Sequence, residues 1–531
     1  MPISQSNKCT KIFWKLFQHF YASTTPGSKT DNIMELEPVI GLEIHVQLKT
    51  KSKMFCSCDN AGENQPPNTT ICEICTGQPG TLPMLNEQAV DFGIRIALAL
   101  NCRIPHQSVF SRKSYFYPDL PKGYQISQYD QPIALEGQFT FPVDGETKTV
   151  GIIRVHLEED TAKMTHLSSS GESMLDYNRA GTPLVEIVTQ PDFHTPQEAK
   201  RFLQELRLLF RYLDVSDADM EKGHLRCDAN ISLRPVGELK YYTKIEIKNL
   251  NSFRSVEKAL QYEIERQTKL WEAGQAPNQH ATRGWNDQRN ITVEQRTKEG
   301  EADYRYFPEP DLPPLKVTQA EIEKMRITMP ELPSQARIRL NDSYGLSITD
   351  IDAIVSDRVL LEYYESTMSE LEAWQESEGL ESEPTMTEES RRRLSKTTVN
   401  WLIHKLLKMI ADSKSGFEDL KITPENFAEF INLIDRGKLH SAISGEVLNR
   451  MFATGQDPSS IIEERGLNKA GTLEDLDLII VRVLNAHPKQ IAQYQSGKIV
   501  VLQYLIGQVM KETKGSVNPD LIKDALLSKL K

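Results

Sequence analysis

Long apolar runs are absent from this 531-residue chain, and no stretch reaches the roughly 18 apolar residues that a membrane-spanning helix needs. The longest apolar segment, Trp401–Ala411, is interrupted by one histidine and two lysines. We therefore interpret it as a core-facing helix and expect no association with a membrane.

Recognisable phosphate-binding loops are also missing. The sequence contains neither G-x-x-x-x-G-K-[ST] nor the kinase-type G-x-G-x-x-G set. It also lacks an identifiable Ser–Lys pattern of amidases or Cys–His pattern of glutaminases. If ATP reacts on this chain, another arrangement must hold its phosphates.

Basic residues are outnumbered, with 62 lysines and arginines against 74 acids and a net charge of -12. This balance does not favour a nucleic-acid partner, because phosphate contacts need a basic surface. Local patches can still supply one, and the candidates are Arg112–Lys113 and Arg391–Arg393. We interpret the second patch more readily as a solvated helix face.

Cysteine is scarce, and three of the seven cysteines are scattered, which favours a reducing compartment over a disulfide scaffold. The other four form two close pairs thirteen residues apart, Cys56-x-Cys58 and Cys72-x-x-Cys75. Two pairs on turns can surround one tetrahedral Zn²⁺ at about 2.3 Å per thiolate. Four thiolates leave no open position, so the predicted zinc is structural. The alternative is four free thiols in an irregular loop.

The first 33 residues differ from the rest and are interpreted as an N-terminal extension. Residues 1–30 hold four lysines and no acid, and Ile12–Tyr21 is apolar and aromatic. A transit peptide to a mitochondrial or plastid matrix has this balance, but this stretch contains no arginine. The preferred interpretation is an upstream extension with Met34 as the working start, in a cytoplasmic protein.

Hydrophobic periodicity predicts an α+β protein whose strands and helices mix up to a Pro-rich segment near Pro314. The expected strands are Val39–Leu48, Val150–Leu157, Pro183–Thr189, Asn230–Arg234 and Lys244–Lys248. The expected helices are Gln88–Asn101, Thr195–Leu213 and Ser252–Ala273. Beyond the Pro-rich segment the pattern is helical, with an acidic loop insertion at Glu376–Glu389 and a second boundary at Asp457 and Pro458.

Three polar motifs could carry chemistry. Glu43 and His45 alternate on one expected strand, so they share a face and could bind a cation or transfer protons. The run Arg154–Asp160 ends in three acids, which repel one another unless a cation or base screens them. Arg226 and Asp228 lie at a turn into another strand and could meet phosphate and metal. Each motif alone could also be a solvated surface feature.

Seven segments together resemble the B-subunit family of tRNA-dependent amidotransferases, from about Leu36 to Lys531. They are Pro38–Leu48, Ser114–Gln131, Arg154–Asp160, Asp176–Val188, Leu225–Leu233, Ile245–Phe253 and Asp303–Pro310. The tail segment Gly507–Pro519 resembles the C-terminus of the same family.

The resemblance implies a cradle-like α/β catalytic domain at 34–330, a helical domain at 331–456 and a YqeY-like, tRNA-binding tail at 457–531. It implies that ATP phosphorylates the side chain of misacylated Glu-tRNA(Gln) or Asp-tRNA(Asn), and that ammonia then replaces the phosphate. Glutamine would supply the ammonia through an amidase A subunit, and a short C subunit would brace the pair. The cysteine pairs resemble those of the zinc-bearing branch of the family.

The resemblance also implies site residues. Those implied as Mg²⁺ ligands are Glu43, His45, Glu159 and Asp228, with Glu158 behind them. Those implied to meet phosphate or the tRNA end are Arg112, Lys113 and Arg226.

Two other interpretations compete with this one. A tRNA-binding scaffold without chemistry would need no convergent carboxylates. An archaeal-type relative specific for Glu-tRNA(Gln) carries an inserted domain, for which the segment between Phe253 and Tyr304 has no room.

Overall fold

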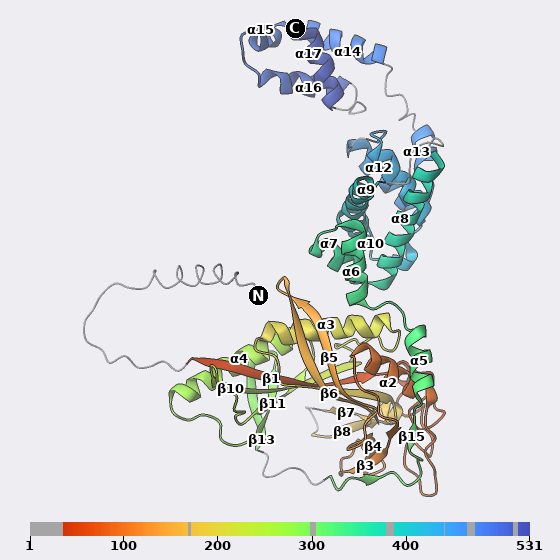
Figure 1. Cartoon of the computed structure of the whole chain (residues 1–531), viewed down its shortest axis with the longest axis vertical. Coiled ribbons are helices and arrows are strands. Elements are labelled where there is room, and N and C mark those ends of the chain that lie inside the picture. Colours follow the sequence, from red (N-terminus) through yellow and green to blue (C-terminus); the bar gives the residue numbers. More distant parts are fainter. Residues whose placement is uncertain are drawn as a thin grey trace, which may run out of the picture.

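The computed structural model describes residues 35–167, 171–297, 304–378, 387–439, 441–464, 473–512 and 519–530. The expected N-terminal extension and residues 379–386 of the expected acidic insertion lie outside this part. Within it, no helix is long and apolar enough to cross a membrane. Figure 1 shows the strands gathered in the N-terminal region and helices alone in the C-terminal region. The predicted α+β class is therefore confirmed.

An eight-stranded sheet organises the N-terminal region. Neighbouring strands pair antiparallel, except β11 and β12, which are parallel. In spatial order the strands are β13 (Ile291–Thr297), β12 (Ala281–Asn286), β11 (Ile245–Leu250), β10 (Leu225–Pro235), β1 (Leu36–Gln47), β9 (Pro183–Thr189), β6 (Glu146–Glu159) and β5 (Ala134–Val143). The five strands expected from the sequence all belong to this sheet.

One face of the sheet is covered by helices. Apolar residues alternate along β1, and Ile40, Leu42, Ile44 and Val46 are buried in one core with residues of α3 (Pro196–Tyr212) and α4 (Phe253–Glu272). Both helices begin at capping side chains, Thr195 and Ser252, and α2 (Glu87–Ala99) contacts β6. Since strand side chains alternate, the polar residues between the apolar ones point to the other face.

Small sheets lie on the side of the main sheet away from α3 and α4 (Figure 1). One sheet joins β14 (Phe307–Pro308), β3 (Phe110–Ser114) and β4 (Tyr124–Gln128), another joins β15 (Leu315–Lys316) and β2 (Gln107–Ser108), and a hairpin joins β7 (Lys163–His166) and β8 (Ser173–Asp176). Strand β4 packs on β6, where the Gln128 side chain accepts a bond from the Leu157 amide at 3.1 Å. Single 3₁₀ turns occupy Gly62–Asn64 and Tyr177–Arg179.

A second core unites most of the helices that follow. Helix α5 (Gln319–Thr328) still packs on the first core through Ile322. The second core joins α6 (Pro333–Tyr344), α7 (Ile348–Val355), α8 (Arg358–Glu378), α9 (Glu388–Trp401), α10 (Leu407–Ser413), α11 (Pro424–Asp435), α12 (Ser441–Thr454) and α13 (Pro458–Glu464). A π-helical turn, Leu402–Leu406, connects α9 to α10, and a 3₁₀ turn spans Phe417–Asp419. Each arginine of the 391–393 patch pairs with a carboxylate, which agrees with a solvated face.

Charged side chains tie the second core to α3. Arg337 of α6 contacts Glu205 of α3 at 2.8 Å and Asp352 of α7 at 2.7 Å. The Tyr212 hydroxyl, at the end of α3, donates a buried hydrogen bond of 2.9 Å to the Val355 carbonyl. The helical region is thus attached to the helix layer and not to the free face of the sheet.

A third, separate core forms the C-terminal tail. It joins α14 (Leu473–Ala486), α15 (Pro488–Gln495), α16 (Val501–Glu512) and α17 (Pro519–Leu530). Figure 1 shows this unit at the far end of the molecule from the sheet. Helix α13 belongs to the second core through Ile461 and Ile462, so we propose that the tail begins after Glu464 and not at residue 457.

The separation of the cores predicts how truncations behave. A chain ending at Glu464 loses only the third core, so its main thermal transition should shift by less than about 2 °C. A chain ending at Gln456 also loses Ile461 and Ile462, whose burial should contribute about 3 kcal/mol, and should melt several degrees lower. Scanning calorimetry of both chains tests this expectation. Equal melting of the two truncated chains would contradict it.

Candidate active site and cysteine cluster

The register of three neighbouring strands gathers polar residues on the free face of the sheet. His45 on β1 lies opposite Glu186 on β9, and Glu186 lies opposite His156 on β6. Two residues along each outer strand, Glu43 and Glu158 project on the same face. We call these five residues, Glu43, His45, His156, Glu158 and Glu186, the polar cluster.

Glu186 connects the two histidines of the polar cluster. Its Oε2 lies 3.3 Å from His45 Nε2 and 3.0 Å from His156 Nε2. The His45 Nε2 also lies 3.5 Å from Glu158 Oε1 and 4.0 Å from Glu43 Oε1. The polar cluster contains two overlapping triads that could each hold a metal ion, their ligand atoms within 4.8 Å of one another. The triads are Glu43, His45, Glu186 and His156, Glu158, Glu186.

Burial and the neighbouring carboxylates set the protonation of the polar cluster. Burial opposes protonation of His45, but the hydrogen bond and charge of Glu186 outweigh it and raise the pKa of His45 to about 8. The same balance, with Glu158 and Glu186 opposing burial, raises the pKa of His156 to about 9. Burial and the Glu186 charge raise the pKa of Glu43 above its usual range. The carboxylates of the polar cluster therefore favour the protonated form of both histidines.

Basic and aromatic side chains surround the polar cluster. Two adjoining cavities of about 310 and 390 Å³ share Glu43, Lys113 and Lys248 in their walls. The Lys248 Nζ lies 2.6 Å from Asp228 Oδ2, and Lys113 Nζ lies 5.0 Å from the centre of the Tyr304 ring. Arg226 lines the larger cavity and donates to Asp160 Oδ2 at 2.8 Å. An anionic substrate entering these cavities would meet carboxylates and cations together.

The structure brings some of the predicted residues together and separates others. Glu43, His45 and Glu158 belong to the polar cluster, Asp228 lies opposite Glu43 on β10, and Lys113 and Arg226 line the cavities. The remaining two predicted residues, Glu159 and Arg112, do not line them.

Strand alternation explains why these two residues point away. Glu159 follows Glu158 and therefore points away from the polar cluster; its carboxylate pairs with Lys122 and accepts a 2.9 Å bond from the Ile126 amide. Arg112 precedes Lys113 and is held by the buried Glu309 at 2.6 and 2.8 Å. Both residues tie small strands in place and do not face the cavities.

Sequence reasoning missed Glu186, His156 and Lys248 as functional candidates. Glu186 is the one charged residue in the apolar strand Leu184–Val188, which is an unusual position unless the side chain has a partner. The pair His156-x-Glu158 repeats the spacing of Glu43-x-His45. These two signals could have pointed to Glu186 and His156, but only the order of the strands shows that these side chains meet Glu43, His45 and Glu158.

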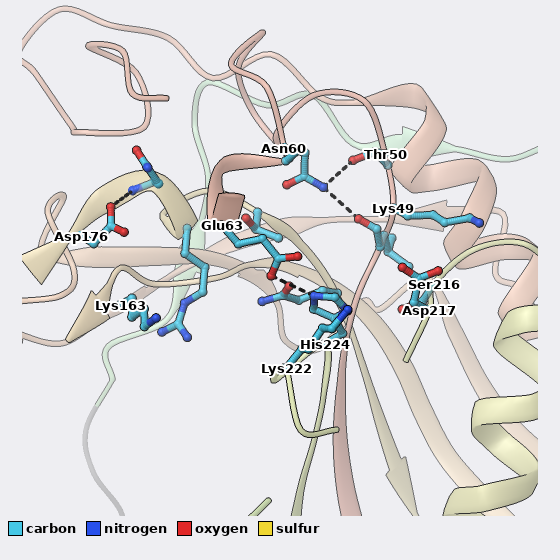
Figure 2. A pocket seen from close by; sticks show the side chains of 16 residues that line it. Lys49, Thr50, Asn60, Glu63, Lys163, Asp176, Ser216, Asp217, Lys222 and His224 are labelled. Carbon is cyan, nitrogen blue, oxygen red and sulfur yellow. Dashed lines mark hydrogen bonds and ion pairs between the residues drawn. The ribbon is translucent and has the colours of Figure 1, made fainter. Parts of the chain in front are cut away.

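Another cavity, of about 320 Å³, lies beyond the end of β1. Figure 2 shows Lys49, Glu63, Lys163 and His224 around it, with His224 Nε2 3.0 Å from Glu63 Oε2. Gln47 and Arg179 line this cavity and also contact Asp160. The two residues therefore form part of the wall between it and the cavity that contains Arg226.

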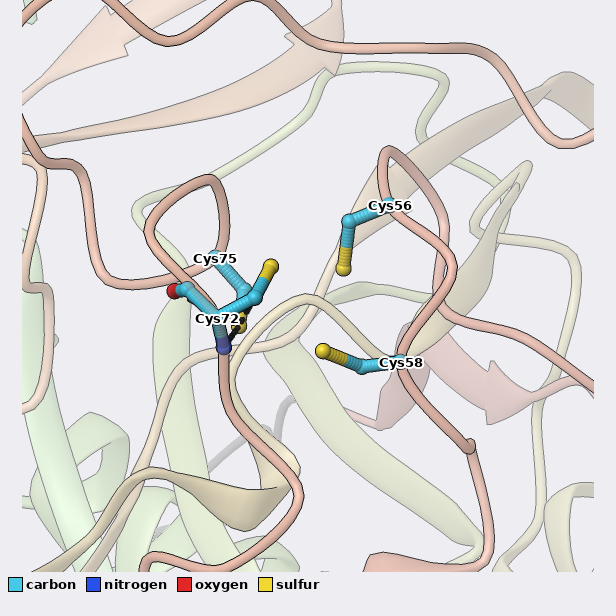
Figure 3. A group of neighbouring side chains, drawn as sticks. All are labelled: Cys56, Cys58, Cys72 and Cys75. Carbon is cyan, nitrogen blue, oxygen red and sulfur yellow. Dashed lines mark hydrogen bonds between the residues drawn. The ribbon is translucent and has the colours of Figure 1, made fainter.

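The four clustered cysteines meet in space. Figure 3 shows their side chains converging from two loops, and their sulfur atoms all lie within 4.8 Å of one another. A regular tetrahedron with Zn–S bonds of about 2.3 Å has S···S edges of about 3.8 Å. The observed separation between the Cys72 and Cys75 sulfurs is 3.9 Å, so this donor set fits one zinc ion. None of the four forms a disulfide.

Two family models match separate parts of the chain. The family model described as "GatB/GatE catalytic domain" matches residues 38–323, which include the polar cluster and all four clustered cysteines. A second model, "GatB domain", matches residues 385–530. The chain belongs to the GatB/GatE family.

Individual relatives of the GatB/GatE family match nearly the whole chain. A protein from Moorella thermoacetica, named as the B subunit of aspartyl/glutamyl-tRNA(Asn/Gln) amidotransferase, is 44% identical, covering 94% of this chain and 100% of its own length. Proteins with the same name from Persephonella marina and Carboxydothermus hydrogenoformans are 44% and 42% identical, over 94% and 93% of this chain. They cover 100% and 99% of their own lengths.

The opposite orientations of two adjacent acids give a first test of the site. Glu158→Gln should weaken Mn²⁺ binding at least about 10-fold, because it removes a carboxylate from the polar cluster. Glu159→Gln should leave Mn²⁺ binding within about 2-fold but lower the free energy of unfolding by about 3 kcal/mol, because the buried pair with Lys122 is broken. Calorimetric Mn²⁺ titration and urea denaturation measure the two effects. An equal loss of Mn²⁺ affinity in both variants would contradict the placement.

The two histidines predict a pH dependence of the metal-free protein. Their pKa values of about 8 and 9 exceed the unfolded value of about 6.5. Their contribution to stability is therefore fully present below pH about 6.5 and is lost as the pH rises through about 8 and 9. The shift of His45 alone corresponds to about 2 kcal/mol. Urea denaturation with chelator at pH 6 and 9.5 should show a larger loss in the wild type than in His45→Asn. Equal losses of stability between pH 6 and 9.5 in the two proteins would refute the raised pKa of His45.

Proposed function

We propose that this chain is the activating component of a tRNA-dependent amidotransferase that consumes ATP. The substrate would be a glutamate or aspartate already esterified to tRNA(Gln) or tRNA(Asn). One observation carries the proposal. The region that matches the catalytic-domain model contains the polar cluster of three carboxylates and two histidines, which lies beside two cavities with basic walls. A tRNA-binding scaffold without chemistry would not need this arrangement.

The proposed chemistry has two steps. A side-chain carboxylate of the substrate attacks the γ-phosphorus of ATP, the bond to the bridging oxygen breaks, and ADP leaves. Ammonia then attacks the acyl-phosphate carbon, inorganic phosphate leaves, and a proton is lost as the amide forms. Phosphorylation is required because a carboxylate is a poor acyl donor and a mixed anhydride is a good one.

The residues around the cavities suit the charges of this reaction. Lys113 and Lys248 line both cavities and could contact the phosphate oxygens, whose charge is spread in the transition state. Arg226, fixed by Asp160, could orient the substrate in the larger cavity. Stacked rings of Tyr129 and Tyr306, 4.1 Å between centres, flank the smaller cavity and could exclude water from it.

A divalent cation, which we propose to be Mg²⁺, would be held by Glu43, His45 and Glu186, with Glu158 beside them. It would offset the charge of the transferring phosphoryl group. This set replaces the one implied by family resemblance, since Glu159 points away and Asp228 is paired with Lys248. The use of an imidazole ligand also favours Mn²⁺ as a substitute.

Ammonia would come from glutamine through an amidase A subunit, and a small C subunit would brace the complex. The relatives are named as the B component of their enzyme, which supports an assembly of several chains. The absence of a recognisable amidase or glutaminase pattern supports an external source of ammonia. We further propose that the four cysteines hold a structural zinc ion and that the C-terminal tail binds tRNA.

The proposal is tested in the reconstituted complex by release of ³²P-phosphate from γ-labelled ATP, dependent on misacylated tRNA. Glu43→Gln and Glu186→Gln should each lower turnover at least about 100-fold, the equivalent of about 3 kcal/mol of transition-state stabilisation. The matched control is Glu146→Gln, an exposed acid on the same strand as Glu158, which should turn over normally. Without the amidase partner, ammonium salt should restore amide formation.

Three outcomes would oppose the proposal. Wild-type turnover in both cluster variants would place the chemistry elsewhere. Retained tRNA binding without any ATP consumption by the wild-type complex would favour the scaffold. Glutamine hydrolysis by the isolated chain would overturn the external source of ammonia.

A further inference from the structure

Lys53 is a fully buried lysine, with 0% of its surface exposed. It lies three residues before Cys56, and its backbone amide donates a 3.0 Å hydrogen bond to the carbonyl of Cys58. The Lys53 Nζ lies 3.8 Å from Cys75 Sγ and 3.5 Å from the Tyr177 carbonyl oxygen. A lysine is rarely fully buried unless its charge has a partner.

No carboxylate in the described part of the chain lies within 4.0 Å of the Lys53 ammonium group. The side-chain amine contacts the Cys75 sulfur and the Tyr177 carbonyl oxygen, and a carbonyl oxygen alone offsets little of the cost of a buried charge. Four thiolates around one Zn²⁺ leave two uncompensated negative charges. The buried ammonium group of Lys53 therefore needs a negative partner, and a zinc-bound cysteine cluster needs a positive one.

We propose that Lys53 is the charge-compensating partner of the zinc site and donates a hydrogen bond to the Cys75 thiolate. This inference rests on the proposed zinc ion and adds a residue outside the four cysteines. Partners behind metal ligands orient those ligands and tune their affinity for the metal. Here the partner is a full positive charge in a dry position, where its interaction with a thiolate is weakly screened.

The turn at Gly181 passes close to this contact, and its positive φ is a conformation that favours glycine. Gly181 has a φ of +84°, and a Cβ at this position would meet Cys75 Cβ at 3.4 Å and Lys53 Cδ at 3.5 Å. Its carbonyl accepts a 2.8 Å hydrogen bond from the Met54 amide. Met54 follows Lys53, and Gly181 precedes the strand that carries Glu186. The Lys53 contact thus joins the cysteine loops to a turn leading into the candidate active site.

The test compares Lys53→Met with Lys51→Met, a matched removal of an exposed lysine two residues away. Zinc content of the wild type is measured first, and a content below about 0.2 per chain would refute the zinc proposal itself. In zinc-loaded protein, Lys53→Met should transfer zinc to a chelator at least about 10-fold faster than the wild type. Lys51→Met should stay within about 2-fold. Equal transfer rates in all three proteins would overturn the role of Lys53.

Two further measurements separate charge compensation from simple packing. In Co²⁺-substituted protein, loss of a hydrogen bond to Cys75 should move the sulfur-to-metal charge-transfer band to longer wavelength in Lys53→Met and not in Lys51→Met. In wild-type protein, an amine-acylating reagent should spare Lys53 while zinc is bound and modify it after zinc removal, with Lys51 modified in both states. Equal labelling of Lys53 in both states would overturn the proposal even if Lys53→Met did not fold.

Discussion

The repulsion among buried carboxylates on the free face of the sheet is the constraint on which the proposed site depends. Glu43, Glu158 and Glu186 project into one small space because three antiparallel strands are in register there. Without positive charge this arrangement would be costly, since Glu158 and Glu186 are buried and Glu43 is half-buried. Two histidines and nearby lysines offset part of that charge. The remaining deficit is what would give the site its affinity for a cation and for phosphate bound to it.

The rest of the fold leaves this face of the sheet open to the two cavities and covers the opposite face with helices. Helices α3 and α4 cover one side of the sheet, so the apolar residues of β1 are buried there and its polar residues are left for chemistry. The small sheet of β3 and β4 lies on the other side and contributes Lys113. Glu159 and Arg112 hold that small sheet through Lys122 and Glu309. On each of these strands one residue, Glu158 or Lys113, faces the proposed site, and its neighbour, Glu159 or Arg112, holds the small sheet in place.

The cysteine loops and the helical region attach to the catalytic sheet from different directions. The loops reach it through Lys53 and the turn at Gly181, close to the entrance of β9. The helical region reaches it through Arg337, whose guanidinium joins α6 and α7 to α3. Because α3 packs on the covered face, the proposed tRNA-binding tail is connected to the sheet without blocking the cavities.

The sequence by itself determined the elements of the fold and the chemistry of its parts. Periodicity predicted the strand that holds Glu43 and the strands next to Glu158 and Asp228, and cysteine spacing predicted the four-sulfur cluster, because these signals are local. Only the tertiary structure decided which residues meet. It brought Glu186 and His156 into the site and turned Glu159 away, since strand order and register are set by contacts between distant segments. A residue's neighbour across a sheet cannot be determined from its position along the chain.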